Sequence, residues 1–189
     1  MLNVVLVEPE IPANTGNVGR TCVIAGARLH LVAPGFDLSE RAVRRAGLAY
    51  WQSLDVRAYA SWEDFLIAAR PEPGRMHLLT KAGETLYTDA RFSDGDWLVF
   101  GRESTGLPAS LIAAHPDRCL RIPMRGDEAL SNAEAWHEGH ADLHPELARD
   151  ACGNYVDPRA GSVMSLNLSN AVALVLYEAL RQTGFPGLV

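Results

Sequence analysis

Cysteine is scarce in this chain of 189 residues, and no two of its three cysteines (Cys22, Cys119 and Cys152) have the Cys-x-x-Cys spacing of a zinc or redox site. An odd number of widely spaced cysteines argues against a disulfide framework and fits a reducing compartment. No apolar run approaches the roughly 20 residues that cross a bilayer. The opening run Leu2–Val7 is too short for a secretory leader and predicts a first strand. We therefore expect a soluble, cytoplasmic globular protein with no membrane partner.

The common nucleotide and hydrolase motifs are missing as well. Gly101 and Gly106 have the spacing of a Walker loop, but Leu107-Pro108 follows where that loop needs its phosphate-binding lysine. No Gly-x-Gly-x-x-Gly follows the first apolar run, which argues against an ordinary dinucleotide site. The Gly-x-Ser-x-Gly elbow of many hydrolases is also absent.

Lysine is nearly absent, since 16 of the 17 basic side chains are arginine. Arginine suits phosphate recognition because its guanidinium is a planar fork, although a GC-rich genome gives the same bias. Residues 127–161 contain eight acidic and two basic side chains and so carry the whole formal net charge of −6, while the rest balances at 15 and 15. We interpret 127–161 as an acidic insertion in a single domain that spans 1–189. The net charge therefore does not decide whether the partner is a nucleic acid.

Short apolar runs alternate with helical patterns along the chain. The first run is followed by a predicted turn at 14–17 and a helix to about Gly26, and the last helix carries a long apolar stripe. The predicted strands are 3–7, 29–32, 76–80, 97–100 and 119–122, and the predicted later helices lie around 62–69 and 168–180. This alternation predicts an α/β fold with a mainly parallel sheet and helices on both faces.

Three polar, turn-forming segments stand at the ends of predicted elements: Asn14–Arg20, Gly101–Pro108 and Ser165–Asn170. Each has a plain structural interpretation by itself, because Asn and Ser cap helices and Gly makes turns. Ligands of open α/β sheets, however, bind at the carboxyl ends of the strands. Three such segments at the same end of one sheet therefore favour a ligand site.

These segments resemble the motifs of the SPOUT-superfamily RNA 2′-O-ribose methyltransferases. Asn-x-Gly-Asn-x-x-Arg, Gly-x-Glu-x-x-Gly-Leu-Pro, Ile-Pro-Met and Ser-Leu-Asn-Leu-Ser-Asn-Ala occur in that family in the order found here. The opening residues 2–12 and the Arg44-Arg45-Ala-Gly-Leu segment look most like the branch that methylates the wobble nucleotide of tRNA (TrmL type). The resemblance covers about 1–126 and 162–189, that is, nearly everything except the acidic insertion.

The resemblance implies a fold, a methyl donor and a set of site residues. The family fold is an α/β domain with a deep C-terminal trefoil knot that works as a homodimer on RNA, here tRNA. Its methyl donor is S-adenosylmethionine. The positions matching the donor site are Leu79, Gly101, Ile122 and Ser165. The positions matching the site of the reacting ribose are Asn14, Arg20, Glu103, Ser165 and Asn167.

The implied reaction asks a ribose hydroxyl to lose a proton while it attacks the methyl group of a sulfonium, so positioning should supply much of the rate. Arginine stays protonated at neutral pH, which makes Arg20 a poor general base. We expect Arg20 instead to clamp the phosphate beside the target and to stabilise the developing oxyanion. Asn14 and Asn167 can orient the ribose or Arg20, because amides both donate and accept hydrogen bonds.

Arg41, Arg44 and Arg45 share one face of a predicted helix at i, i+3 and i+4, and we expect them to contact the RNA backbone. The alternative for them is a solvated helix face. Tyr50 and Trp51 are candidates either for stacking on a base or for packing in the core, with packing favoured.

The acidic insertion leaves two alternatives open. His140 and His144, at i and i+4, could face a metal from one helix turn, but a solvated polar surface explains them as well, and we expect no metal. The insertion could also block the donor pocket and make the chain a non-catalytic RNA- or S-adenosylmethionine-binding module. Within the enzyme class, the rival to wobble methylation is 2′-O-methylation at another tRNA or rRNA position.

Overall fold

The computed structural model describes residues 1–38, 49–124 and 165–189. The described strands are β1 (Asn3–Val7), β2 (Arg28–Val32), β3 (Val56–Tyr59), β4 (Met76–Leu79), β5 (Thr85–Leu86), β6 (Trp97–Phe100) and β7 (Cys119–Arg121). The described helices are α1 (Pro12–Ala25), α3 (Trp62–Ala69), α4 (Ala109–Ala114) and α6 (Leu168–Gln182), with short 3-10 turns η1 (Ala49–Ser53), η2 (Pro73–Arg75) and η3 (Pro116–Arg118).

The chain forms two compact units. The first consists of Met1–Ile122 together with Leu168–Val189, and it contains every strand and helix named above. The second is Pro123–Asn167, of which the described residues are Pro123, Met124 and Ser165–Asn167. The predicted acidic insertion, 127–161, lies outside the described residues.

The described strands form one sheet in the order β3-β2-β1-β6-β4-β7-β5. Each described pair of neighbouring strands is parallel. From β1 the chain moves outward to β2 and β3 on one side, and it then returns to build the other side with β4 to β7. The order therefore reverses between β1 and β6, and such a switch point is where open α/β sheets bind ligands. The predicted parallel α/β sheet is confirmed, while the trefoil knot stays a prediction.

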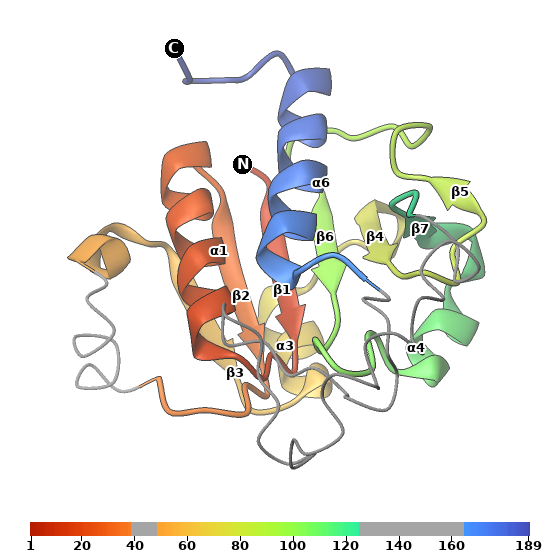
Figure 1. The fold of residues 1–189 in the computed structure, drawn as a ribbon, viewed down its shortest axis with the longest axis horizontal. Helices are drawn as coiled ribbons and strands as arrows, with labels where there is room; N and C mark the ends of the chain where they lie inside the picture. Colours follow the sequence, from red (N-terminus) through yellow and green to blue (C-terminus); the bar gives the residue numbers. More distant parts are fainter. Residues whose placement is uncertain (39–48, 125–164) are drawn as a thin grey trace, which may run out of the picture. The chain divides into compact units, whose positions relative to one another are not determined.

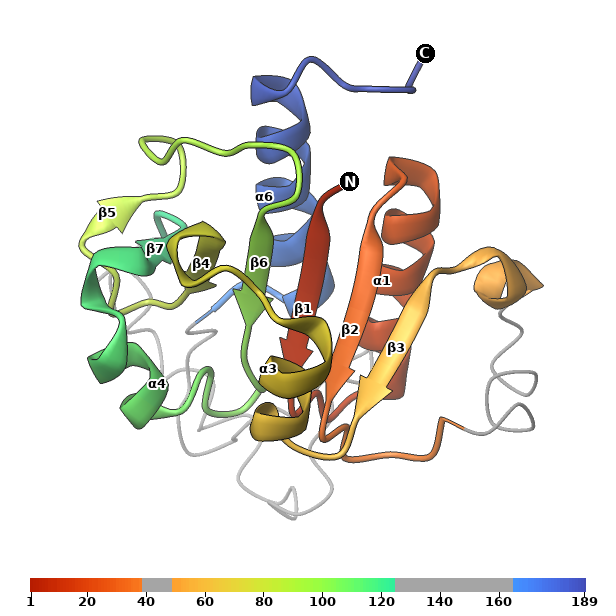
Figure 2. The same ribbon diagram turned by 180° about the vertical axis from the view of Figure 1, so that it is seen from behind.

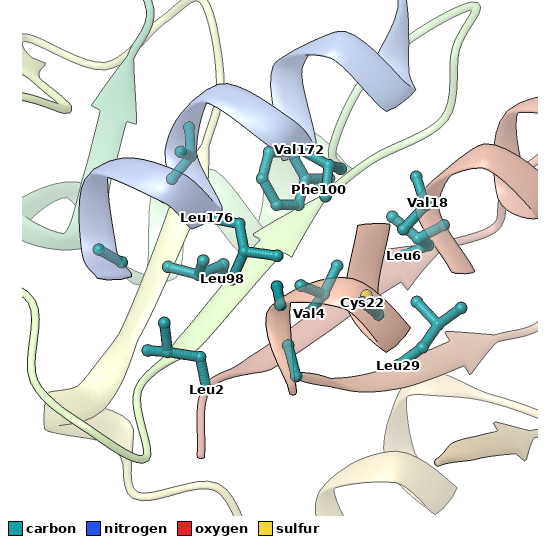
Figure 3. Packing of buried hydrophobic residues seen from close by; sticks show 14 of the residues in the cluster. Leu2, Val4, Leu6, Val18, Cys22, Leu29, Leu98, Phe100, Val172 and Leu176 are labelled. Carbon is teal, nitrogen blue, oxygen red and sulfur yellow. The ribbon is translucent and has the colours of Figure 1, made fainter. Parts of the chain in front are cut away.

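Helices cover both faces of the sheet. The helices α1 and α6 lie across one face (Figure 1), and α3 and α4 lie across the other (Figure 2). Successive residues of β1 point to opposite faces, so Val4 and Leu6 join one core while Val5 and Val7 join the other. Figure 3 shows the first core, in which β1 and β6 meet apolar side chains of α1 and α6 such as Val18, Cys22, Val172 and Leu176.

The helix α1 begins earlier than the sequence pattern predicts. Pro12 stands in its first turn, where a missing N–H costs nothing, and the helix ends at Gly26, which has the left-handed φ of 63°. The residues of the predicted turn at 14–17 lie inside this helix, so that prediction was wrong. Asn and Gly are weak helix formers, but Asn14, Thr15 and Gly16 are buried here, and tertiary contacts override such propensities.

The later predicted elements are confirmed with small shifts in their ends. The helix α3 begins after Ser61, whose Oγ accepts a hydrogen bond from the Asp64 N–H, and α6 buries its whole predicted apolar stripe. The pattern missed β3, β5 and α4, because β5 has two residues and β3 exposes Arg57 and Ala58, which leaves no apolar alternation to recognise. In the described part of the chain, no helix is long and apolar enough to cross a membrane.

Candidate functional site

The loops that follow β1 and β6 are fastened to each other by two glutamates. The N–H groups of Glu10 and Ile11 donate to the carboxylate of Glu103, at 2.9 and 3.3 Å. In return, the N–H and Oγ–H of Ser104 donate to the carboxylate of Glu10, at 3.0 and 2.9 Å. Hydrogen bonds to a charged acceptor are about twice as strong as neutral ones. These hydrogen bonds therefore hold the two loops at the switch point of the sheet together.

Glu103 also reaches the first turn of α1. The side-chain amide of Asn14 donates to Glu103 Oε1 at 3.0 Å, and Asn14 is buried. Ile11 stands at the N-cap and has no side-chain acceptor, so the Glu103 carboxylate supplies the negative charge that a helix N-terminus favours. Two of the predicted site residues, Asn14 of α1 and Glu103 of the loop after β6, are thus brought into direct contact.

The loop after β6 owes its tight shape to two glycines. A side chain on Gly101 would place its Cβ 2.1 Å from the carbonyl carbon of Gly106, so the backbone leaves no room for one. Gly106 has a φ of 74°, in the left-handed region that suits glycine. Between them, the backbones of Arg102 and Gly106 exchange hydrogen bonds of 3.1 and 3.0 Å. This turn carries Glu103 and explains the spacing of the Gly-x-Glu-x-x-Gly motif.

Two residues without glycine's freedom adopt left-handed backbone conformations at the same edge of the sheet. Glu8 directly follows β1 with a φ of 52°, and Ala33 directly follows β2 with a φ of 45°. Each such conformation costs roughly 1–2 kcal/mol, and strained residues gather at functional sites. Glu8 is held by its N–H, which donates to the Val32 carbonyl at 2.7 Å, and by an ion pair with Arg102. No sequence signal pointed to this strain.

The predicted donor-site positions of the first unit lie at neighbouring strand ends. Leu79 ends β4, where it pairs with Phe100 of β6 and Leu120 of β7, and Gly101 and Ile122 follow those two strands. Leu79 and Ile122 are half-buried apolar side chains that pack against the core, and Gly101 is buried. Two apolar side chains at neighbouring strand ends suit a flat nucleoside base better than a phosphate or a cation. These residues therefore fit the nucleoside part of S-adenosylmethionine.

Arg20 lies on α1, about 9 Å along the helix axis from Asn14 at the usual rise per residue. Its side chain is exposed, and its guanidinium carbon lies over the ring of Tyr50, 5.1 Å from the ring centroid. The Tyr50 hydroxyl donates to the carbonyl of Gly16 at 2.6 Å. Trp51 packs against the core on the α1 side of the first unit, as the packing alternative predicts, whereas Tyr50 contacts Gly16 and Arg20 of α1.

The other predicted residues lie either in the second unit or outside the described residues. Ser165 and Asn167 belong to the second unit, so their place beside Asn14 and Glu103 stays a prediction. Arg41, Arg44 and Arg45 and the histidine pair His140 and His144 lie outside the described residues. Within 1–38, 49–124 and 165–189, no three His, Cys, Asp or Glu side chains are grouped as a metal site would need.

The sequence and the fold are similar to those of known RNA methyltransferases. The profile of the SpoU rRNA Methylase family matches residues 1–133. A tRNA (cytidine(34)-2'-O)-methyltransferase of Burkholderia cenocepacia is 41% identical over 99% of both chains. A putative RNA methyltransferase structure from Bacillus anthracis has a TM-score of 0.76 at 38% identity and covers 100% of this chain and 98% of its own.

Two further solved structures are similar in fold. One, described as giving insight into the 2-OH methylation of C/U34 on tRNA, has a TM-score of 0.71 at 38% identity and covers 97% of each chain. The SpoU methyltransferase AviRb of Streptomyces viridochromogenes, in complex with the cofactor AdoMet, has a TM-score of 0.64 at 24% identity, covers 97% of this chain and 60% of its own, and shares the fold.

Proposed function

The chain belongs to the SpoU rRNA methylase family, and from that membership we propose that it methylates the 2′-hydroxyl of the wobble ribose, at cytidine or uridine 34, in tRNA. The observation that carries this proposal is the similarity, over 99% of both chains, to a relative named for that position and that reaction. The structure whose description names C/U34 supports the same substrate at 38% identity.

We propose S-adenosylmethionine as the methyl donor, held by Leu79, Gly101, Ile122 and Ser165. When bound, this group supplies a methyl on a positively charged sulfur. Support comes from the half-buried apolar side chains of Leu79 and Ile122, which lie at neighbouring strand ends. The Streptomyces protein of the same fold is in complex with this cofactor.

The chain's own residues position the ribose and its neighbouring phosphate. Arg20 is exposed and permanently cationic, so it binds the phosphate beside the target and stabilises negative charge on the attacking oxygen. Glu103 fixes the Asn14 amide with its N–H end toward the carboxylate, and this determines which end of the amide can accept from the ribose. In this proposal Ser165 and Asn167 also orient the ribose, and the hydroxyl proton leaves to water or to the clamped phosphate.

We propose that Arg41, Arg44 and Arg45 contact the RNA backbone, and that the enzyme works in the cytoplasm, where tRNA is modified. If one of these arginines contacts a phosphate, replacing it should weaken binding to all tRNAs. The salt dependence of binding should then fall by about one counterion per lost contact.

We also propose that the protein is a homodimer that pairs through α1 and α6. These helices lie side by side on one face of the sheet (Figure 1). They carry exposed apolar side chains: Ile24 is 63% exposed, Leu174 44% and Tyr177 41%. A single exposed apolar side chain is ordinary, but several on adjoining helices mark an interaction surface.

The test incubates purified protein with methyl-labelled S-adenosylmethionine and tRNA that lacks the modification, and then locates the label by nuclease digestion and mass spectrometry. We expect label on the ribose of nucleotide 34. Arg20→Ala should lower the rate about 100-fold, the usual cost of losing one group that stabilises an oxyanion. The matched control, Arg91→Ala, removes an exposed arginine from the loop before β6 and should leave the rate unchanged.

Each other outcome corrects a different part of the proposal. Label at another nucleotide keeps the chemistry and replaces the substrate. A folded protein that transfers no label would overturn the enzyme assignment in favour of a binding module. An Arg20→Ala variant with the full rate would refute the role given to this arginine.

A further inference from the structure

Tyr50 of the turn η1 is the aromatic partner of the arginine that the proposed reaction uses. We propose that Tyr50 is a positioning residue, which holds the Arg20 guanidinium in the orientation needed for methyl transfer. This inference rests on the proposed function of Arg20, and Tyr50 itself touches neither the ribose nor the methyl donor in this role.

The hydrogen bond of Tyr50 reaches the helix turn that carries Arg20. Its hydroxyl donates to the Gly16 carbonyl at 2.6 Å, and Gly16 stands four residues before Arg20 in α1. In an α-helix, the carbonyl of residue i also accepts from the N–H of residue i+4. The Tyr50 hydroxyl therefore bonds the same carbonyl that accepts the backbone hydrogen bond of Arg20. The guanidinium carbon of Arg20 lies 5.1 Å from the centroid of the Tyr50 ring, within the distance of a cation–π contact.

The turn η1, which carries Tyr50, packs closely against α1. A Cβ added to Gly19 would meet Leu54 Cδ2 at 3.1 Å and the Trp51 ring at 3.3 Å, closer than ordinary contacts. Gly19 therefore allows η1 to approach the helix, and Trp51 and Leu54 hold η1 there. Because both the turn and the helix are fixed, the ring of Tyr50 offers Arg20 one platform.

Arg20 and Tyr50 form a contact between a cation and a neutral ring, and not an ion pair. Burial raises the pKa of the Tyr50 phenol, while the charge of Arg20 and its hydrogen bond to the phenol act in the opposite direction. The phenol is thus neutral at physiological pH and does not itself neutralise the positive charge of Arg20. A carboxylate in the same place would neutralise that charge, whereas an aromatic ring orients a guanidinium and leaves it available to a phosphate.

The experiment measures kcat and KM for tRNA in Tyr50→Phe, which keeps the ring, and in Tyr50→Leu, which loses it. We expect Tyr50→Leu to lower kcat by about 5- to 30-fold, the range of a cation–π contact, with KM for tRNA changed less than about threefold. Tyr50→Phe should keep kcat within about threefold of the parent, because the ring is retained. Trp51→Leu removes packing on the same turn without touching Arg20, and thermal unfolding of all three shows how much of any effect is loss of structure.

A double-mutant cycle separates positioning from a structural role. In an Arg20→Ala background, followed under single-turnover conditions, Tyr50→Leu should produce no further loss, because its effect passes through Arg20. An equal loss in both backgrounds, a Tyr50→Phe variant as slow as Tyr50→Leu, or an effect on KM alone would overturn the inference. Failure of the parent protein to label nucleotide 34 would instead overturn the proposed function.

Discussion

His30 shows how a single buried side chain is satisfied in this fold. Its ring is 1% exposed in β2, with Nδ1 2.9 Å from the Tyr59 hydroxyl and Nε2 3.3 Å from Asn3 Oδ1. Burial lowers its pKa to about 4, and the positive charges of Arg28 and Arg57 act in the same direction. The ring is therefore neutral at pH 7 and serves packing, like most histidines found inside proteins with both nitrogens bonded.

We expect this histidine to make the protein sensitive to mild acid. In the unfolded chain its pKa is near the ordinary value of about 6.5, so between pH 6.5 and pH 4 the unfolded state binds more protons and stability falls as the pH falls. The loss should approach about 3 kcal/mol at pH 4. Urea unfolding at pH 7, 6, 5 and 4.5 measures it, and His30→Gln should be less stable at pH 7 but flatter through this window. If the unfolding free energy of His30→Gln fell with pH as steeply as that of the parent, groups other than His30 would cause the loss of stability in acid.

The helix α1 and the loop after β6 depend on each other. The helix has no side-chain acceptor at its own N-cap, and Glu103 of the loop provides the charge there, while the loop is closed by its two glycines and by Glu10. Each element therefore stabilises the position of the other. Coupling between them is therefore a property of the pair of elements.

Gly101→Ala should disrupt this pair. The new Cβ meets backbone atoms of Gly106 and Leu107 at 2.1 to 2.4 Å, which cannot be relieved by turning a side chain. We expect a loss of about 2–4 kcal/mol of stability, as for overpacking of a rigid site, and weaker S-adenosylmethionine binding by calorimetry. Gly74→Ala is the matched control, since its Cβ would meet only the end of the Arg118 side chain at 3.7 Å. If Gly101→Ala were as stable as this control and bound the donor normally, the assigned close approach would be wrong.

Helices on both faces of the sheet expose apolar side chains, and this bears on assembly. On the face covered by α1 and α6 (Figure 1), Ile24 and Tyr177 are exposed, and on the face covered by α3 and α4 (Figure 2), Ile67 is 71% exposed. Both faces therefore offer exposed apolar groups, and the proposed dimer selects the first of them.

A charge placed on one face at a time tests the proposed dimer. Tyr177→Glu, on α6, should convert the dimer to a monomer in sedimentation velocity, because an unpaired charge is costly in an apolar interface. Ile67→Glu, on α3, makes the same kind of change on the opposite face and should leave the dimer intact. A Tyr177→Glu protein that still sediments as a dimer, or a parent that is monomeric, would refute pairing through α1 and α6.

Local patterns were sufficient for the elements whose signal is periodic. The apolar run of β1 and the stripe of α6 were predicted to within a residue or two, because burial repeats every two residues in a strand and every 3.6 in a helix. The four motifs, in their order along the chain, were likewise sufficient to identify the family. Where local preference and burial disagree, the pattern failed: Asn14 to Asn17 favour a turn as residues, yet they belong to α1.

The arrangement of the site depends on contacts that no local pattern contains. Asn14 and Glu103 are 89 positions apart, and they meet because the chain reverses its strand order between β1 and β6. The strained backbones of Glu8 and Ala33 run against local preference and persist because hydrogen bonds from neighbouring strands hold them. The family and the reaction could thus be predicted from the sequence, whereas the hydrogen bonds from Glu103 to α1 and the contact of Arg20 with Tyr50 required the fold, since long-range packing sets both.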